Sequence, residues 1–277
     1  MVIFSAQHIT KYYDHFLAVS DVSFDVEHSQ IIALLGSNGA GKSTMIKMLC
    51  GLSRPSSGEM RVLDKLFESD ATKIKAQIGY VPEESALYED VTVMQYLLFF
   101  GSLYGLSKSV IEKRAHTLLG ELDLVAGDKL IAELSKGMKR KVLIARSLLH
   151  DPQVLIYDEP ASGLDPQTSA FILSFMQKLQ HGGKTILFSS HNLSHVEKIA
   201  QRVIILHKGK KVFDGTVEEL TAKKHATYTV TYRIGEHVHT QAVTLSQFKE
   251  IAKQHDIVEI VSHQPSVEDA FFSLINS

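Results

Sequence analysis

A glycine-rich segment, GSNGAGKST, occupies residues 36–44 and combines flexible backbone with a cation and hydroxyl groups. The pattern G-x-x-x-x-G-K-[ST] is typical of a phosphate-binding loop, in which successive backbone N–H groups curl around an anion. Lys42 can reach the terminal phosphates of a nucleotide, and the Ser43 hydroxyl can ligate magnesium. A glycine-rich turn without a ligand is the alternative interpretation. The candidate nucleotide-binding residues here are Gly36, Ser37, Asn38, Gly39, Ala40, Gly41, Lys42, Ser43 and Thr44.

Two carboxylates follow an apolar run in VLIYDEP, at residues 154–160. Such a run predicts a buried strand, and open α/β sheets bind their ligands beyond the carboxyl ends of the strands. Asp158 is therefore a candidate magnesium ligand acting through water, and Glu159 is a candidate general base for an attacking water. The pair is a weak signal alone and a strong one together with the loop at 36–44.

The elements that must position these groups alternate between short apolar runs and helical patterns, which indicates an α/β fold. Nearly continuous apolar runs predict strands of a mostly parallel sheet. These runs lie at residues 31–35, 154–157, 185–190 and 203–206. Segments near 2–10 and 18–27 alternate more and predict an antiparallel edge sheet. A helical pattern from about 84 to 150 predicts a helical insertion between two halves of the core.

The composition changes after Leu220, and the remaining chain predicts a small α+β appendage. TYTVTYRI predicts a strand, SQFKEIAKQ a helix, IVEIVS a strand and VEDAFFSLI a final helix. The expected domains are therefore residues 1–220 and 221–277. His237 and His239 share one strand face as a candidate metal pair, but no third ligand is evident and the metal interpretation is disfavoured.

The totals exclude several classes of protein. A net charge of −2 over 277 residues argues against a dedicated nucleic-acid binder, so no nucleic-acid partner is expected. Cys50 is the only cysteine, which rules out an intrachain disulfide. The most membrane-like run, at residues 93–106, is shorter than the roughly 20 residues that span a bilayer, and it predicts a buried helix. Any link to a membrane is therefore expected through a partner.

Taken together, the motifs resemble the ATP-binding subunit of ABC transporters over about residues 1–220, in the order that the family shows. GSNGAGKST resembles the Walker A loop, LIYDEP the Walker B strand, and LSKGM at 134–138 the signature loop. SGLDP at 162–166 resembles the D-loop, and SSHN contains His191 at the place of the switch histidine. Tyr13 stands where the family stacks an aromatic ring on adenine.

The resemblance implies a P-loop NTPase core and an ATPase that works as a dimer with ATP and magnesium. Each ATP would lie between the Walker motifs of one subunit and the signature loop of a second, identical or different, ATPase subunit. Ser135 and the Gly137 N–H would contact that trans nucleotide, and Asp165 of the D-loop belongs to the same implied site. The implied catalytic residues are Lys42, Glu159 and His191.

The partner implied by the resemblance is an integral membrane permease, which would hold the chain at the cytoplasmic face of the cell membrane. Contact is expected near Glu83 to Asp90, where ALYEDV offers acidic and aromatic groups. The variant motifs and the ending PSVEDAFFSLI resemble the branch that exports drugs, lipids, polysaccharides or peptides. The sequence does not identify the transported substrate.

Three positions depart from the family pattern. Lys136 replaces the usual glycine, Met138 replaces a glutamine, and Glu83 replaces the glutamine of the Q-loop. Glu83 can still ligate magnesium, because that cation prefers oxygen ligands. Lys136 is expected to point into solvent, because fixing a flexible lysine costs entropy.

The basic run at residues 139–141 could mark a patch for nucleic acid or acidic lipid. It is expected in the first turn of a helix that ends at Leu149, where cations oppose the helix dipole. We interpret these side chains as extending into water, which screens that repulsion.

Two other functions share part of this motif set. A soluble ABC-type ATPase of translation or DNA repair would carry two cassettes or a long coiled coil, and neither is apparent. A P-loop kinase would have no evident role for LSKG or SGLDP. The motif set therefore favours a transporter ATPase.

Overall fold

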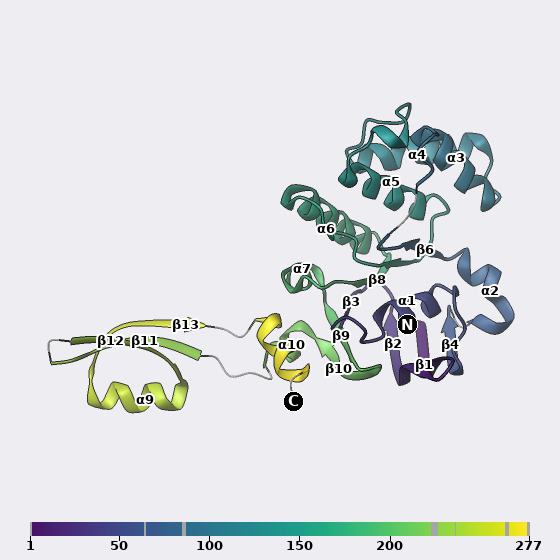
Figure 1. Cartoon of the computed structure of the whole chain (residues 1–277). Coiled ribbons are helices and arrows are strands. Elements are labelled where there is room, and N and C mark those ends of the chain that lie inside the picture. Colours follow the sequence, from purple (N-terminus) through teal and green to yellow (C-terminus); the bar gives the residue numbers. More distant parts are fainter. Residues whose placement is uncertain are drawn as a thin grey trace. The chain divides into compact units, whose positions relative to one another are not determined.

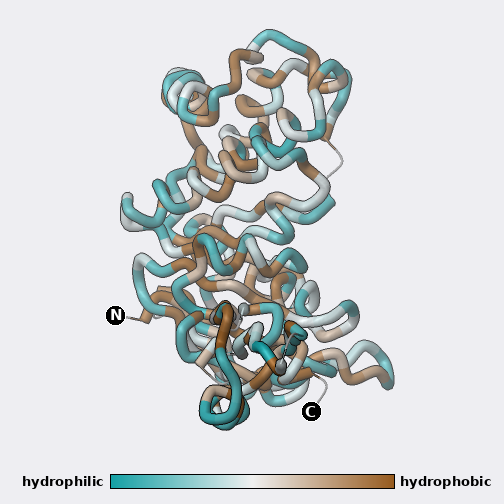
Figure 2. Tube along the Cα trace, turned by 90° about the vertical axis from the view of Figure 1, so that its left-hand side faces the viewer, coloured by the Kyte–Doolittle hydropathy of each residue, from teal (hydrophilic) through white to brown (hydrophobic). Residues whose placement is uncertain are grey.

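The computed structural model describes residues 2–63, 65–84, 87–222, 227–235, 237–263 and 266–275 (Figure 1). The chain divides into two compact units, Met1–Asp214 and Gly215–Ser277. Figure 2 shows hydrophobic residues in the interior segments of the first unit and hydrophilic residues on its outer turns.

A six-stranded sheet forms the centre of the first unit, in the order β10-β9-β3-β8-β7-β6. Its strands are β3 (Ile31–Leu35), β6 (Ile78–Val81), β7 (Val154–Tyr157), β8 (Thr185–Ser189), β9 (Arg202–His207) and β10 (Lys210–Thr216). β3 pairs in parallel with β8 and β9, and β7 pairs in parallel with β6 and β8. The four predicted core strands are confirmed. The short β6, interrupted by a glycine, and the charged β10 were not predicted.

An antiparallel sheet lies beside this core, in the order β2-β1-β4-β5. It contains β1 (Val2–Tyr13), β2 (Phe16–Glu27), β4 (Ser57–Val62) and β5 (Lys65–Leu66). The predicted antiparallel edge is confirmed, with both of its first strands longer than expected. Helix α1 (Lys42–Leu49) buries Met45, Ile46, Met48 and Leu49 in the same apolar cluster as residues of both sheets.

The predicted helical insertion is also confirmed, and its helices gather at one end of the first unit (Figure 1). It comprises α3 (Val93–Leu103), α4 (Lys108–Glu121), the 3₁₀ turn η1 (Ile131–Glu133) and α5 (Lys136–Leu148). α5 begins earlier than expected, because Ser135 caps it by accepting a hydrogen bond from the Met138 N–H.

The apolar run at 93–106 is only partly buried, which corrects the expectation of a buried helix. Val93, Tyr96 and Leu97 are buried, whereas Phe99 and Leu103 are 50% and 65% exposed. Among the described helices, none has the length and apolar character to cross a membrane.

The remaining helices of the first unit are α2 (Phe67–Lys75), α6 (Pro166–His181) and α7 (Leu193–Ile199). α6 starts at a favourable boundary, because Asp165 caps it and Pro166 occupies its first turn.

The second unit contains α8 (Val217–Ala222), β11 (Thr227–Ile234), β12 (His237–Thr244), α9 (Leu245–Gln254), β13 (Asp256–His263) and α10 (Val267–Ile275). Its sheet has the order β12-β11-β13. The predicted strands and helices are confirmed, and of the polar β12 only the strand face shared by His237 and His239 was expected. Val230 and Val243 are buried in this sheet, Leu220, Val267, Ala270 and Phe271 are buried in the helices α8 and α10, and Phe248 of α9 stacks on Tyr228. Within the described residues, no group of three potential ligands could hold a metal ion, so the pair His237 and His239 gains no third ligand.

Candidate functional site

The loop between β3 and α1 has the shape of an anion-binding turn. Gly39 and Gly41 have φ angles of 78° and 102°, a region that L side chains rarely adopt. A Cβ at Gly41 would also lie 2.7 Å from the backbone oxygen of Ala18. These glycines let the chain turn directly into α1, so that the first N–H groups of the helix point into the loop.

A cavity of about 380 Å³ opens beside this loop and gathers groups from widely separated segments. Its lining comprises Phe16, Ala18, Asn38, Gly39, Gly41, Lys42, Ser43, Thr44, Glu83, Asp158, Glu159 and His191. The predicted Walker A, Walker B, Q-loop and switch residues therefore meet in one place. Gly36, Ser37 and Ala40 shape the loop from behind, with Ala40 buried and its N–H donating to the Ser37 oxygen.

Lys42 is held by its own loop. Its Nζ donates hydrogen bonds to the Gly36 oxygen at 2.7 Å and to the Ser37 oxygen at 3.3 Å. Burial lowers the pKa of Lys42, and the carboxylates of Glu159, Asp158 and Glu83 oppose that shift. The ammonium is thus held at the cavity and partly desolvated, so it can exchange its hydrogen bonds to the loop carbonyls for hydrogen bonds to a phosphate.

Asp158 and Glu159 follow β7 and are both only 7% exposed. The Ser189 hydroxyl, at the end of β8, donates to Asp158 Oδ1 at 2.5 Å and accepts from the Glu159 N–H at 2.9 Å. Glu159 has a φ of 48°, in the left-handed region that non-glycine residues rarely adopt outside functional sites. Sequence reasoning missed Ser189, although its place at the end of a predicted core strand could have indicated it.

Glu159 also contacts the candidate switch histidine. Its Oε2 lies 2.9 Å from Nδ1 of His191. Burial raises the pKa of Glu159, and the hydrogen bond and charge of His191 oppose that rise. A buried carboxylate with a raised pKa is a stronger base than an ordinary glutamate, so this pair can activate water.

The cavity offers oxygen ligands for a hard cation. Ser43, Asp158 and Glu83 line it together, and magnesium takes oxygen ligands while keeping several sites for water or phosphate.

Comparison with known proteins identifies the family to which the chain belongs. The family model described as "ABC transporter" matches residues 19–162. The chain is 38% identical over 207 residues to the ABC transporter ATP-binding protein NatA of Bacillus subtilis (strain 168), covering 73% of this chain and 83% of that protein. This chain belongs to the ABC transporter ATP-binding proteins.

Further relatives agree with this assignment. The Nod factor export ATP-binding protein I of Ralstonia nicotianae (strain ATCC BAA-1114 / GMI1000) is 36% identical over 220 residues, covering 79% of this chain and 68% of that protein. A solved structure of the ATP-binding subunit of an ABC transporter is 33% identical with a TM-score of 0.73, covering 80% of this chain and 92% of that one. The chain is therefore an ABC-type ATPase with an ABC cassette fold.

In this ABC ATPase, the expected adenine-stacking residue lies outside the cavity lining. Tyr13 is 43% exposed, and Lys11 Nζ stands 5.1 Å from its ring centroid. Phe16, its partner across the β1–β2 hairpin, lines the cavity and is 65% exposed. Sequence reasoning missed Phe16, which is a second aromatic available to a base.

The signature loop and the D-loop meet each other, and the D-loop also touches the cavity lining, because the Ser162 N–H donates to the Glu159 oxygen at 3.2 Å. A Cβ at Gly137 would lie 3.0 Å from Thr168 Cγ2, and the Thr168 N–H donates to Asp165 at 2.9 Å. That hydrogen bond lowers the pKa of Asp165. Ser135 is exposed at the start of α5. Ser135, Gly137 and Asp165 are not among the residues that line the cavity of their own chain.

The basic run does not extend into water, which corrects our interpretation of it. Lys139 Nζ lies 2.7 Å from Glu89 Oε1, and Lys141 Nζ donates to the Asp123 oxygen at 3.2 Å. Arg140 donates to the backbone oxygens of Pro82 and Glu83, both at 2.8 Å. Each cation therefore has a partner within the chain, and all three lie beyond or at the end of the first turn of α5.

Lys136 lies at the surface, as expected. The residue is exposed, yet its Nζ would lie 2.3 Å from a Cβ on Gly163 of the D-loop. The ammonium of the signature loop therefore rests against the D-loop of the same chain.

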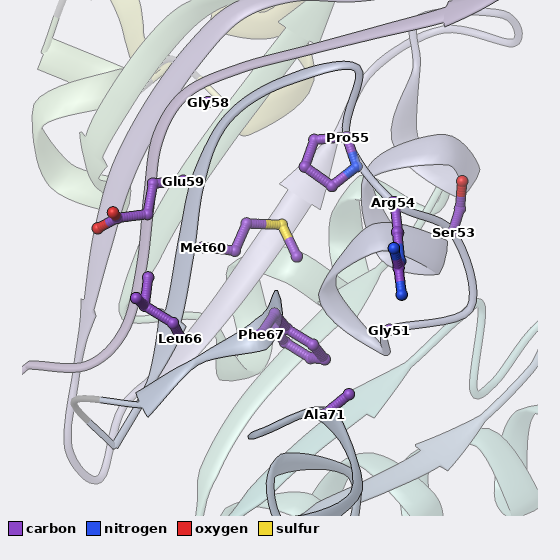
Figure 3. Close-up of a pocket in the computed structure, with 10 residues that line it drawn as sticks. All are labelled: Gly51, Ser53, Arg54, Pro55, Gly58, Glu59, Met60, Leu66, Phe67 and Ala71. Atoms are coloured by element: carbon purple, nitrogen blue, oxygen red, sulfur yellow. The ribbon is translucent and has the colours of Figure 1, made fainter. Parts of the chain in front are cut away.

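A second cavity, of about 170 Å³, lies between the end of α1, β4 and α2 (Figure 3). Met60, Leu66, Phe67 and Ala71 provide much of its apolar lining. It shares no lining residue with the nucleotide cavity, so it is separate from the site above.

Proposed function

We propose that this chain is the ATP-hydrolysing subunit of an ABC exporter, working as one of two cassettes that clamp ATP and magnesium. One observation carries the proposal: Lys42, Ser43, Glu83, Asp158, Glu159 and His191 line a single cavity at the end of the parallel strands. Phosphoryl transfer to water needs positioning, charge stabilisation and a base, and these groups can provide all three.

Each side chain has a proposed part in hydrolysis. Lys42 leaves its loop carbonyls to bind the β- and γ-phosphates, and Glu159 accepts a proton from the attacking water. His191 holds the Glu159 carboxylate and faces the γ-phosphate. Ser43, Asp158 and Glu83 would hold magnesium, which offsets phosphate charge when it is bound. Tyr13 stacks on adenine at the open end of the site, with Phe16 beside it.

The second half of the site comes from another copy or a related subunit. Ser135, Gly137 and Asp165 do not line the cavity of their own chain, in keeping with contact to a nucleotide in trans. Ser135 and the backbone N–H of Gly137 are then placed at a helix start, which favours an anion. ATP would join the two subunits, and hydrolysis would separate them.

We place the contact with the membrane permease on an aromatic patch at the start of the helical insertion. The patch consists of Tyr88, Phe99, Phe100, Leu103 and Tyr104. Tyr88 is 57% exposed, and its ring lies 6.2 Å from Phe99 and 6.4 Å from Phe100. Exposed apolar groups of this size indicate an interaction surface. Residues 85 and 86 of the predicted contact lie outside the described residues.

This permease would hold the chain at the cytoplasmic face of the cell membrane. Export, rather than import, is supported by relatives such as the Nod factor export protein and by the Lys136 and Glu83 variants. We retain residues 1–220 as the ATPase domain, with the helical subdomain at about 84–150. Residues 221–277 are an accessory region that binds a regulator or extends the dimer.

Affinity purification of the tagged full chain from native membranes tests this function. We expect an integral membrane protein to co-purify, and the complex to release inorganic phosphate from ATP. Recovery with ribosomes or DNA instead would favour the translation or repair class of ABC ATPase. A phosphorylated metabolite in place of free phosphate would favour a kinase.

Substitutions in the patch test the docking surface separately. Phe99→Asp and Leu103→Asp should abolish recovery of the permease while ATP binding remains. Val125→Asp is the matched control, because Val125 is 95% exposed and lies outside the patch. Permease recovery that is equal for all three variants would remove the patch from the interface.

A further inference from the structure

Arg140 is a buried arginine whose guanidinium donates hydrogen bonds to two backbone oxygens. It is only 6% exposed. Nη1 donates to the Pro82 oxygen and Nη2 to the Glu83 oxygen, each at 2.8 Å. A guanidinium is a rigid fork that can span two acceptors, which the single ammonium of a lysine cannot do in the same way.

These two hydrogen bonds join helix α5 to the segment that follows β6. Pro82 and Glu83 directly follow β6 of the central sheet, and Arg140 lies in α5, which starts at Ser135. The side chain of Arg140 alone therefore connects Glu83, the proposed magnesium ligand, with helix α5, which is proposed to contact ATP in trans.

The packing around this connection is tight. A Cβ on Gly79 of β6 would lie 2.4 Å from the Ser147 backbone oxygen of α5, so helix and strand approach closely. A second arginine of α5, Arg146, donates to the Tyr80 oxygen at 3.3 Å and to the Tyr96 hydroxyl at 2.9 Å. Strand β6 and helix α5 are thus held together at both ends of the contact.

Charge favours the same arrangement. Burial lowers the pKa of Arg140. The negative charges of Glu83, Asp158 and Glu159 oppose that shift, because they stabilise the charged guanidinium. A buried cation beside the magnesium-binding carboxylates also limits their mutual repulsion. Substituting this arginine should therefore disturb Glu83 more than residues on the far side of α5.

We propose that Arg140 is a positioning residue, whose guanidinium fixes the backbone of Glu83 and ties the place of that carboxylate to the helix that begins at Ser135. This role rests on the proposed function of Glu83 as a magnesium ligand. Arg140 itself does not contact the reacting groups. It makes the two nucleotide-contacting elements move together, so that cation binding on one side orients the signature loop on the other.

Binding of a non-hydrolysable ATP analogue, measured on the purified full chain with and without magnesium, tests the proposal without relying on turnover. Arg140→Lys and Arg140→Gln should reduce the gain in affinity that magnesium confers by about tenfold, the factor expected for hydrogen bonds to a charged group. Affinity without magnesium should change by less than about twofold.

A double-mutant cycle with Glu83→Gln separates positioning from general stability. If Arg140 acts through Glu83, adding Arg140→Lys to Glu83→Gln should cause little further loss of the magnesium effect. Fully additive losses, or losses that appear equally without magnesium, would overturn the proposal. Thermal unfolding midpoints confirm that each variant is folded.

Lys141→Gln is the matched control, because it removes one positive charge from the next position of α5. Lys141 Nζ lies 4.3 Å from the centroid of the Phe171 ring and donates to the Asp123 oxygen, so its contacts differ from those of Arg140. It should leave the magnesium effect within about twofold of the parent. If the parent itself gains no affinity from magnesium, the proposed function of Glu83 fails; if the parent gains and Arg140→Lys matches it, only the role of Arg140 fails.

Discussion

The Nδ1 atom of His191 lies 2.9 Å from Oε2 of Glu159, and the two side chains differ sharply in exposure, at 63% and 9%. The carboxylate is therefore buried against the end of β7, while the imidazole stands at the mouth of the cavity. Burial raises the pKa of Glu159, the proposed base, and the exposed imidazole is accessible to an incoming phosphate.

Glu159→Gln should abolish turnover and preserve ATP binding. The amide keeps the size of the side chain but cannot accept the proton, so the rate should fall by about 10²–10⁴-fold. Steady-state ATPase assays and gel filtration with ATP measure the two effects, and we expect a trapped nucleotide-bound dimer. Hydrolysis at the parental rate would remove Glu159 from the role of base.

The ATPase rate should fall at acid pH as Glu159 is protonated. Because burial raises its pKa, this loss begins at a higher pH than for an ordinary glutamate, and the rate is highest above that pKa. His191→Gln removes a hydrogen bond and a charge that lower the pKa of Glu159, so the acid limb should move to still higher pH. Rate profiles from pH 5 to 9 at saturating ATP, about the range in which such groups titrate, would show the shift. An unmoved acid limb would contradict this coupling.

Ser135→Arg should spare nucleotide binding by the isolated subunit and block the closed dimer. The added bulk and charge lie at the start of α5, outside the cavity lining of the same chain. Loss of the helix cap should cost about 1 kcal/mol, which does not prevent folding. Nucleotide titration and gel filtration in the Glu159→Gln background separate the two steps.

Ser107→Arg is the control for that substitution, because Ser107 is the exposed N-cap residue of α4 and makes no side-chain capping bond. It should dimerise with ATP as the parent does. Normal ATP-dependent dimers of Ser135→Arg would show that our account of the signature loop is wrong.

His150 should make the fold less stable in acid. Its ring stacks on Tyr104 with centroids 3.8 Å apart, and its Nε2 lies 3.1 Å from the Ile78 oxygen. Burial lowers the pKa of His150 to about 4 from 6.5. The unfolded chain therefore binds an extra proton between these values, so stability present above pH 6.5 is lost as pH falls through that window.

The loss attributable to His150 should be about 2 kcal/mol once its partial exposure is allowed for. His150→Phe keeps the ring stack and removes the titrating group, so its unfolding midpoint should fall less between pH 6.5 and 4 than that of the parent. Thermal melts across this range measure the difference. Parallel curves for the two proteins would contradict the assignment.

Local sequence patterns were sufficient to predict the core strands, the phosphate loop and the helical insertion. A continuous apolar run such as residues 31–35 specifies a buried strand through its own side chains, and Gly41 permits a turn that other residues resist. The same reasoning missed β6, with Gly79 and Tyr80 in a short run, and most of the polar β12. These strands depend on neighbours across the sheet rather than on their own pattern.

The sequence by itself determined the family, the order of its motifs and the chemistry that each motif can perform, because those depend on residue types at short spacing. Only the tertiary structure decided which distant groups meet: Ser189 on Asp158, Phe16 at the cavity, and Arg140 on the carbonyls of Pro82 and Glu83. The physical reason is that sheet order and helix packing determine these contacts. Residues far apart in the chain share no local sequence pattern from which such contacts could be predicted.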